Sequence, residues 1–189
     1  VGVRQWGTYY GGSAADNCVK VSCGGAGDPG ICGGTESLTG IATAGAPDIS
    51  YGGNGDAFIA KFNTNGVRQW GTYLGGSGGE AALGEPGLAA DGLYVTGETL
   101  SADFPQVAGG YQTTNTLSAA FVAHLSLDLS QFVQSTYFGS DFGIDSGFHA
   151  AVDGDVFILG RTNGSDLPGT TGGVQPTYGG LTDLFVARF

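Results

Sequence analysis

Acidic side chains are the residues of this chain best suited to chemistry, because they recur at one place in a repeated sequence. An acid follows each of three segments of the GTYxGG type, and these acids are Asp16, Glu80, Asp141 and Asp145. A calcium ion takes roughly six to eight oxygen ligands from loops of this kind. The acids are singly spaced, without a D-x-D-x-D-G ladder. The pattern therefore favours turn-capping carboxylates over a calcium site.

The two histidines, His124 and His149, do not form part of a recognisable catalytic set. His124 occupies a strand position at which the other units carry Lys61 and Arg188, and neither histidine has a recurring Ser or Cys beside it. Nucleophilic catalysis needs a nucleophile, a base and a group that orients the base. We predict that the protein is not an enzyme, with no catalytic residues and no cofactor; a hydrolase or lyase is the least supported alternative.

Three cysteines occur, all in the first third of the chain. Cys18, Cys23 and Cys32 follow a C-x4-C-x8-C spacing, which lacks the paired C-x2-C of zinc sites. Cys23 and Cys32 flank a turn signal at Asp28-Pro29-Gly30. The cysteines are therefore either buried thiols or partly bridged. If a disulfide forms, this turn favours Cys23–Cys32, with Cys18 free, and the bridge would indicate an oxidising compartment.

These residues are positioned by an internal repeat of about 63 residues. VRQWGTYYGG at 3–12 returns as VRQWGTYLGG at 67–76 and, weakened, as QFVQSTYFGS at 131–140. Other residues recur in step, among them Gly34, Gly97 and Gly160. Self-similarity at a fixed period indicates a repeat architecture. We treat 1–189 as a single repeat region with units at about 1–62, 63–125 and 126–189.

Each unit predicts four short strands. DAFIAKF at 56–62 alternates apolar and polar residues, and VRQWGTYLGG, GLAADG at 87–92 and LYVTGET at 93–99 follow it. Turn signals such as Asn65-Gly66 separate them. Glycine supplies 38 of 189 residues and only 12% are charged, which disfavours long helices. Four short strands per unit with Gly-rich turns are typical of a β-propeller blade.

Net charge excludes some partners. The chain carries −11 with only six Lys and Arg, so it lacks the basic patch that a nucleic-acid-binding protein needs. No apolar run approaches the length of a membrane span. We expect neither nucleic-acid binding nor membrane insertion.

The motifs GTYLGGSG, AADGLYVTGET, SADFP, GGYQTT and DAFIAKFNTNG resemble, in order, those of the bacterial SBBP family, the seven-bladed β-propeller repeat. The resemblance covers most of the chain and is poorest at 13–55. It implies an extracellular or surface-attached bacterial protein, without assigned chemistry. It also implies that the AAD strand is innermost in each blade, followed by LYVTG, DAFIAKF and VRQWGTY. We expect an all-β array of three four-stranded antiparallel blades, forming an incomplete ring or part of a larger assembly.

Three blades leave open edges, since closed propellers typically need about four to eight. The chain is then a fragment of a longer propeller, half of a six-bladed ring, or a subunit that adds a strand to its neighbour. We expect a structural, assembly or adhesion role through self-association. Its strands would be 3–9 and 183–189, and its key residues are Val3, Trp6, Tyr9, Asp183, Phe185 and Phe189.

The alternative is a binding module for a glycan or peptide. The long loops at 98–118 and 162–182 carry three aromatic residues, Phe104, Tyr111 and Tyr178. Exposed aromatic rings on loops stack on sugars, and loops carry function more often than cores do. A glycan is therefore the second partner that the sequence suggests.

Overall fold

The computed structural model describes residues 2–23, 28–140, 145–152 and 155–189, which form antiparallel β-sheets only. The first sheet contains β1 (Asp16–Cys23), β2 (Pro29–Thr35), β3 (Asp56–Phe62) and β4 (Arg68–Leu74), in that order. The second contains β5 (Glu80–Ala82) and β6 (Gly87–Leu88), both beside β7 (Gly92–Thr99), then β8 (Ala119–Ser126) and β9 (Phe132–Phe138). The third contains β10 (Asp145–Val152), β11 (Val156–Thr162) and β12 (Asp183–Arg188). The all-β prediction is confirmed.

Local turn chemistry explains the hairpins. Between β3 and β4, the Asn63 side-chain oxygen accepts hydrogen bonds from the backbone N–H groups of Asn65 and Val67, both at 3.0 Å. Gly66 has φ of 77°, a conformation that glycine adopts without steric cost. The predicted Asn65-Gly66 turn is therefore present, and it sets the register of the two strands that it joins.

The register of the strands recurs between units. Phe58 on β3 lies opposite Tyr73 on β4, and Phe121 on β8 lies opposite Tyr137 on β9. On their other side these phenylalanines pair with Gly33 and Gly97, as Phe185 pairs with Gly160. The equivalent of Gly97 is thus Gly33, so the alignment through Gly34 was wrong by one residue.

The edge strand of the second sheet differs from the prediction. GLAADG forms only the two-residue β6, and β5 precedes it. Leu83 and Gly84 both donate their N–H to the carbonyl of Thr96 at 3.1 Å, and Pro86 has no N–H to donate. These features interrupt the strand, but the expected strand order within the sheet is otherwise observed.

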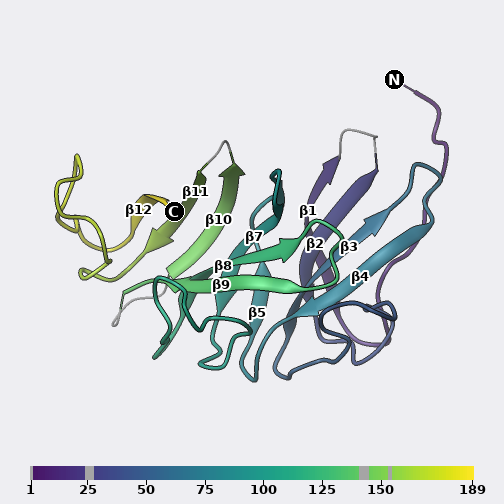
Figure 1. Ribbon diagram of the computed structural model, residues 1–189, viewed down its shortest axis with the longest axis horizontal. Helices are drawn as coiled ribbons and strands as arrows, with labels where there is room; N and C mark the ends of the chain where they lie inside the picture. Colours follow the sequence, from purple (N-terminus) through teal and green to yellow (C-terminus); the bar gives the residue numbers. More distant parts are fainter. Residues whose placement is uncertain (1, 24–27, 141–144, 153–154) are drawn as a thin grey trace.

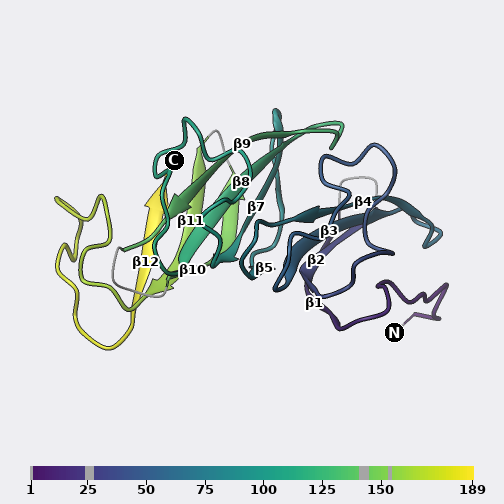
Figure 2. The ribbon, with the colours of Figure 1, turned by 90° about the horizontal axis from the view of Figure 1, so that it is seen from below.

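The sheets stand face to face in an open row (Figures 1 and 2). Ala57, Ile59 and Leu74 of the first sheet belong to one buried cluster with Val95 and Phe121 of the second. A further cluster joins the second sheet to the third and contains Ala120, Val122, Phe138, Ile158 and Phe185. The first and second sheets therefore each bury one face against the sheet that follows in the chain.

The third sheet has three strands where four were expected. Within the described residues, β12 pairs with β11 and with no strand on its outer side. Residues 3–9, expected to be a strand, run along the first sheet without strand structure. No helix in the described part of the chain is long and apolar enough to cross a membrane.

Candidate functional site

The recurring acids are held by hydrogen bonds within the chain. The Asp16 carboxylate accepts hydrogen bonds from the hydroxyls of Thr35 and Ser37 and from the backbone N–H of Gly12. Glu80 repeats this arrangement with Thr99, Ser101 and Gly76. Each acid therefore fastens a Gly-Gly segment to the end of the second strand of its sheet.

This geometry leaves little support for the calcium interpretation. Among the described residues, no group of three or more His, Cys, Asp or Glu side chains is arranged to hold a metal. Oxygen atoms of Asp16 and Glu80 also already accept hydrogen bonds from neighbouring hydroxyl groups. Asp141 and the side chain of Asp145 lie outside the described part of the molecule.

A buried pair of carboxyl groups, not foreseen from the sequence, lies between the first and second sheets. Asp56 is fully buried; one oxygen accepts a hydrogen bond from Gly52 N–H at 2.9 Å, and the other, Oδ1, has no partner. Asp56 Oδ1 and Glu80 Oε2 lie 3.0 and 2.5 Å from the point that a Cβ on Gly75 would occupy. Burial chiefly, and Glu80 in addition, raise the pKa of Asp56 to about 6.

In each unit, the residue at the basic strand position contacts the carboxylate of a nearby aspartate. Lys61 Nζ lies 3.5 Å from the Asp28 carboxylate, and Arg188 pairs with Asp155 at 2.5 Å. His124 takes the same place, with Nε2 3.8 Å from the Asp91 carboxylate and its ring stacked on Tyr94 at 4.4 Å. These contacts explain His124 as a structural residue, while the side chain of His149 lies outside the described residues.

The expected Cys23–Cys32 disulfide is wrong. Cys23 lies opposite Pro29 and Cys32 lies opposite Lys20 in the β1–β2 ladder. The two cysteines are therefore about 10 Å apart along the hairpin, beyond the reach of a disulfide. Cys18, Cys23 and Cys32 are all free thiols, and burial chiefly raises the pKa of the Cys32 thiol to about 12.

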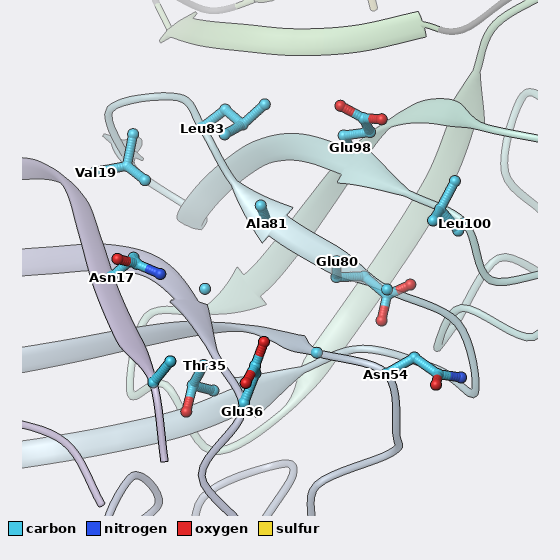
Figure 3. Close-up of a pocket in the computed structure, with 14 residues that line it drawn as sticks. Asn17, Val19, Thr35, Glu36, Asn54, Glu80, Ala81, Leu83, Glu98 and Leu100 are labelled. Carbon is cyan, nitrogen blue, oxygen red and sulfur yellow. The ribbon is translucent and has the colours of Figure 1, made fainter.

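A groove of about 380 Å³ lies between the first and second sheets, at the edge formed by β1 and β5 (Figure 3). Glu36, Asn54 and Glu98 are among its polar lining residues, while Ala81 and Leu83 are among the apolar ones. Among the described residues, its lining contains no cysteine, histidine or serine. Thr35 lines it with a hydroxyl that donates to the Asp16 carboxylate.

The loop aromatics behave differently from one another. Phe104 is buried, with its ring 4.6 Å from that of Phe121 and its N–H bonded to the Tyr137 hydroxyl, so it is unavailable to a ligand. Tyr111 is exposed and lies 6.0 Å from the ring of Phe189. The Tyr178 hydroxyl donates to the carbonyl of Leu181 at 2.7 Å. The two tyrosines line a groove of about 770 Å³ beside β12.

One face of the third sheet exposes residues whose equivalents in the second sheet are buried. Leu184 and Val186 are 76% and 74% exposed, while their equivalents in the second sheet, Ala120 and Val122, are buried. Phe157 and Leu159 lie beside them on β11, paired with Arg188 and Val186. We call the surface formed by Phe157, Leu159, Leu184 and Val186 the open face.

The segment 3–10, at the other end of the chain, exposes a tyrosine that is buried in the other two repeats. Tyr9 is fully exposed at 102%, whereas its equivalents Tyr73 and Tyr137 are 1% and 0% exposed. In the described part of the chain, this segment makes no backbone–backbone hydrogen bond. Its backbone and its tyrosine therefore lack the partners that β4 and β9 have.

The same segment is nevertheless held in a specific position. Tyr10 lies 5.4 Å from Phe58 and 5.6 Å from Phe62, measured between ring centroids. Its equivalent in the third repeat, Phe138 at the end of β9, lies 5.2 and 5.5 Å from Phe185 and Phe189 of the third sheet. The Trp6 indole N–H also donates to the carbonyl of Thr64 at 2.8 Å. Residue 10 thus contacts the first sheet as the end of β9 contacts the third.

The chain matches no protein-family model and no curated protein sequence.

Proposed function

We propose that this protein is a structural or adhesion module that assembles by strand pairing and by burial of sheet faces. In this proposal the sheets are blades of a propeller of the SBBP type, and the module works outside the bacterial cell or on its surface. Support comes from the unpaired backbone of residues 3–10 and from the contact of Tyr10 with the first sheet, which matches the contact of Phe138 with the third sheet.

The internal repeats supply the register of the proposed contact. Phe58 pairs with Tyr73, and Phe121 pairs with Tyr137. By the same register, Phe185 on β12 of one copy pairs with Tyr9 of a second copy. β12 then gains the fourth strand of its sheet, as in strand addition between proteins. The first sheet of the second copy follows directly and covers the open face.

The slot that Tyr9 would enter is also given by the repeats. The Tyr73 hydroxyl donates to the carbonyl of Ser37 at 2.8 Å, and that of Tyr137 donates to the carbonyl of Ser101 at 2.9 Å. The equivalent acceptor in the third unit is the carbonyl of Gly164. Tyr9 of the second copy would therefore bury its ring beside Phe185 and donate to this carbonyl.

The two surfaces lie at opposite ends of the row of sheets (Figure 2). Residues 3–10 therefore do not reach β12 of the same chain, and the contact joins separate copies or separate repeats. Such a contact is head-to-tail, so it forms a closed ring or a filament according to its rotation.

The oligomeric state of the full chain tests this proposal. Sedimentation velocity should show concentration-dependent association, and Val186→Arg should prevent it by placing a charge on the open face. A synthetic peptide of residues 2–11 in excess should dissolve the assembly by occupying β12, while a peptide with Ala at position 9 should not. A chain that stays monomeric at high concentration, and binds no peptide, would contradict the proposal.

The glycan or peptide alternative concerns the same groove beside β12, through Tyr111 and Tyr178. It predicts a monomer whose melting temperature rises with an oligosaccharide, since a ligand that binds only the folded state stabilises it. Loss of that shift in a Tyr111→Ala variant would support the alternative.

A further inference from the structure

Each of the two surfaces of the proposed joint carries one residue equivalent to a member of the buried carboxyl pair between the first and second sheets. In the internal pair, Glu80 approaches Gly75 from β5, and Asp56 approaches it from β3. Asp16 approaches Gly11 in the same way as Glu80, with Oδ2 2.4 Å from the point that a Cβ on Gly11 would occupy. The segment 3–12 thus carries the Glu80 half of such a pair.

The third sheet carries the other half. Asp183 begins β12 as Asp56 begins β3, and its Oδ2 accepts a hydrogen bond from Gly179 N–H at 2.6 Å, as Asp56 Oδ2 does from Gly52. In the register that pairs Phe185 with Tyr9, Asp183 comes beside Gly11 of the second copy. Asp183 and Asp16 of the second copy then face each other as Asp56 and Glu80 do.

We propose that this Asp183–Asp16 pair makes assembly depend on pH, because closing the joint buries two carboxyl groups that together must take up a proton. The inference rests on the proposed function. Two adjacent carboxyl groups removed from water do not both stay ionised readily. In the internal pair, Asp56 Oδ1 is buried and has no hydrogen-bond partner among the described residues, so a negative charge on it is poorly offset. The raised pKa of Asp56 agrees with this reading.

Other charged or titratable groups face the joint and set the background for this effect. On the side of the third sheet these are Arg161, which lies opposite Leu184, and Asp166, which lies beside Gly164. On the side of the second copy they are Tyr9, Tyr10, Tyr73 and Arg68; Tyr10 and Tyr73 lie near Asp16, and Arg68 lies over the ring of Tyr10. Asp166 occupies the position of Asp103, whose carboxylate accepts hydrogen bonds from the backbone and hydroxyl of Ser77. The net charge of −11 also repels one copy from another, so the effect of Asp183 must be separated from general repulsion.

Proton uptake has a defined consequence for affinity. If each joint takes up one proton, its dissociation constant falls by up to about tenfold for each unit by which the pH is lowered across the range of uptake. Position 119 offers a natural comparison, because Ala119 stands in the second repeat where Asp56 and Asp183 stand in the others. An uncharged residue is thus already accepted at this position.

The test measures association of the full-length chain by sedimentation velocity between about pH 5 and pH 8 at constant ionic strength. The parent should associate more tightly as the pH falls, with a slope near one proton per joint. Asp183→Asn and Asp183→Ala should remove most of the slope and associate more tightly than the parent at the alkaline end. Glu85→Gln, which changes the net charge equally at an exposed site away from the joint, should keep it.

The outcomes separate the inference from the proposed function. Association that is equally tight at every pH would overturn the inference and leave assembly standing. A parent and an Asp183→Asn variant that are both monomeric at every pH would overturn both. Association that requires calcium, is abolished by a chelator and is lost in Asp183→Asn would show that a cation rather than a proton joins the two carboxylates, and would overturn the inference as well.

Discussion

Tyr9→Ala should abolish assembly without weakening the fold. Tyr9 is fully exposed in the single chain, while its equivalents Tyr73 and Tyr137 are almost fully buried. Removing a buried aromatic side chain costs about 3–5 kcal/mol, and about 1.4 kcal/mol corresponds to a tenfold change in affinity. The association constant of Tyr9→Ala should therefore fall by a factor of about 10² to 4 × 10³. Its thermal unfolding, measured at a concentration where the parent is monomeric, should be unchanged.

Two matched variants separate the contribution of the ring from that of the hydroxyl, and the effect on association from the effect on folding. Tyr9→Phe keeps the ring and loses only the hydroxyl, so its association should weaken by about fivefold, corresponding to about 1 kcal/mol. Tyr73→Ala removes the same side chain from a site that is already filled, so it should lower the melting temperature of the monomer itself. The reasoning is refuted if Tyr9→Ala associates as tightly as the parent, or if it unfolds as readily as Tyr73→Ala.

Two substitutions and one thiol titration test the buried contacts within the single chain. Asp56 has a folded-state pKa of about 6, above that of an unfolded aspartate. The free energy of unfolding should therefore fall as the pH rises from about 4 to 6, by at most about 3 kcal/mol. In Asp56→Asn, the free energy of unfolding measured with urea should depend less on pH across this range. Tyr137→Phe leaves the buried N–H of Phe104 without its acceptor and removes one of the two donors to the Ser101 carbonyl, which keeps Asn115; it should cost about 1–3 kcal/mol in thermal unfolding. Thiol titration under denaturing, non-reducing conditions should detect three free cysteines, and a reductant should leave the melting temperature unchanged; two thiols lost to a bridge would contradict the strand register.

Repetition in the sequence predicted most of the strands, because each unit buries the same residues in the same register, whereas the order of the strands was taken from the family resemblance. Phe58, Phe121 and Phe185 recur on the third strand and pair with glycine on the second. The first unit was harder. Its hairpin pairs Cys23 with Pro29, three positions from Cys32 along the strand, and the ladder between β2 and β3 pairs Phe58 with Gly33. Spacing alone did not reveal these pairings, so the disulfide and the Gly34 alignment were wrong.

The carboxyl pair was missed for a different reason. Asp56 and Glu80 are distant in sequence and meet only because two sheets pack face to face around Gly75. Each acid by itself fits ordinary capping of a turn, and hydrogen bonds to Gly52 and Gly76 show that both do cap. The sequence did hold one indication of the pair. Asp56 and Glu80 each stand at the start of a strand in consecutive units, one before and one after the Gly75-Gly76 segment.

The position of residues 3–10 bears on both the affinity and the form of the assembly. Tyr10 and Trp6 already hold the segment against the first sheet, so a joint would not need to order a free tail, and preorganisation of this kind favours affinity. A joint that copies the internal sheet contacts also copies their rotation. Two copies would supply six sheets, within the range of about four to eight in which propellers close, whereas three would exceed it. We therefore expect a closed dimer with two identical joints if the rotation between sheets is that of a six-bladed propeller, and a filament otherwise; electron microscopy of the assembled protein distinguishes a ring of fixed size from a fibre.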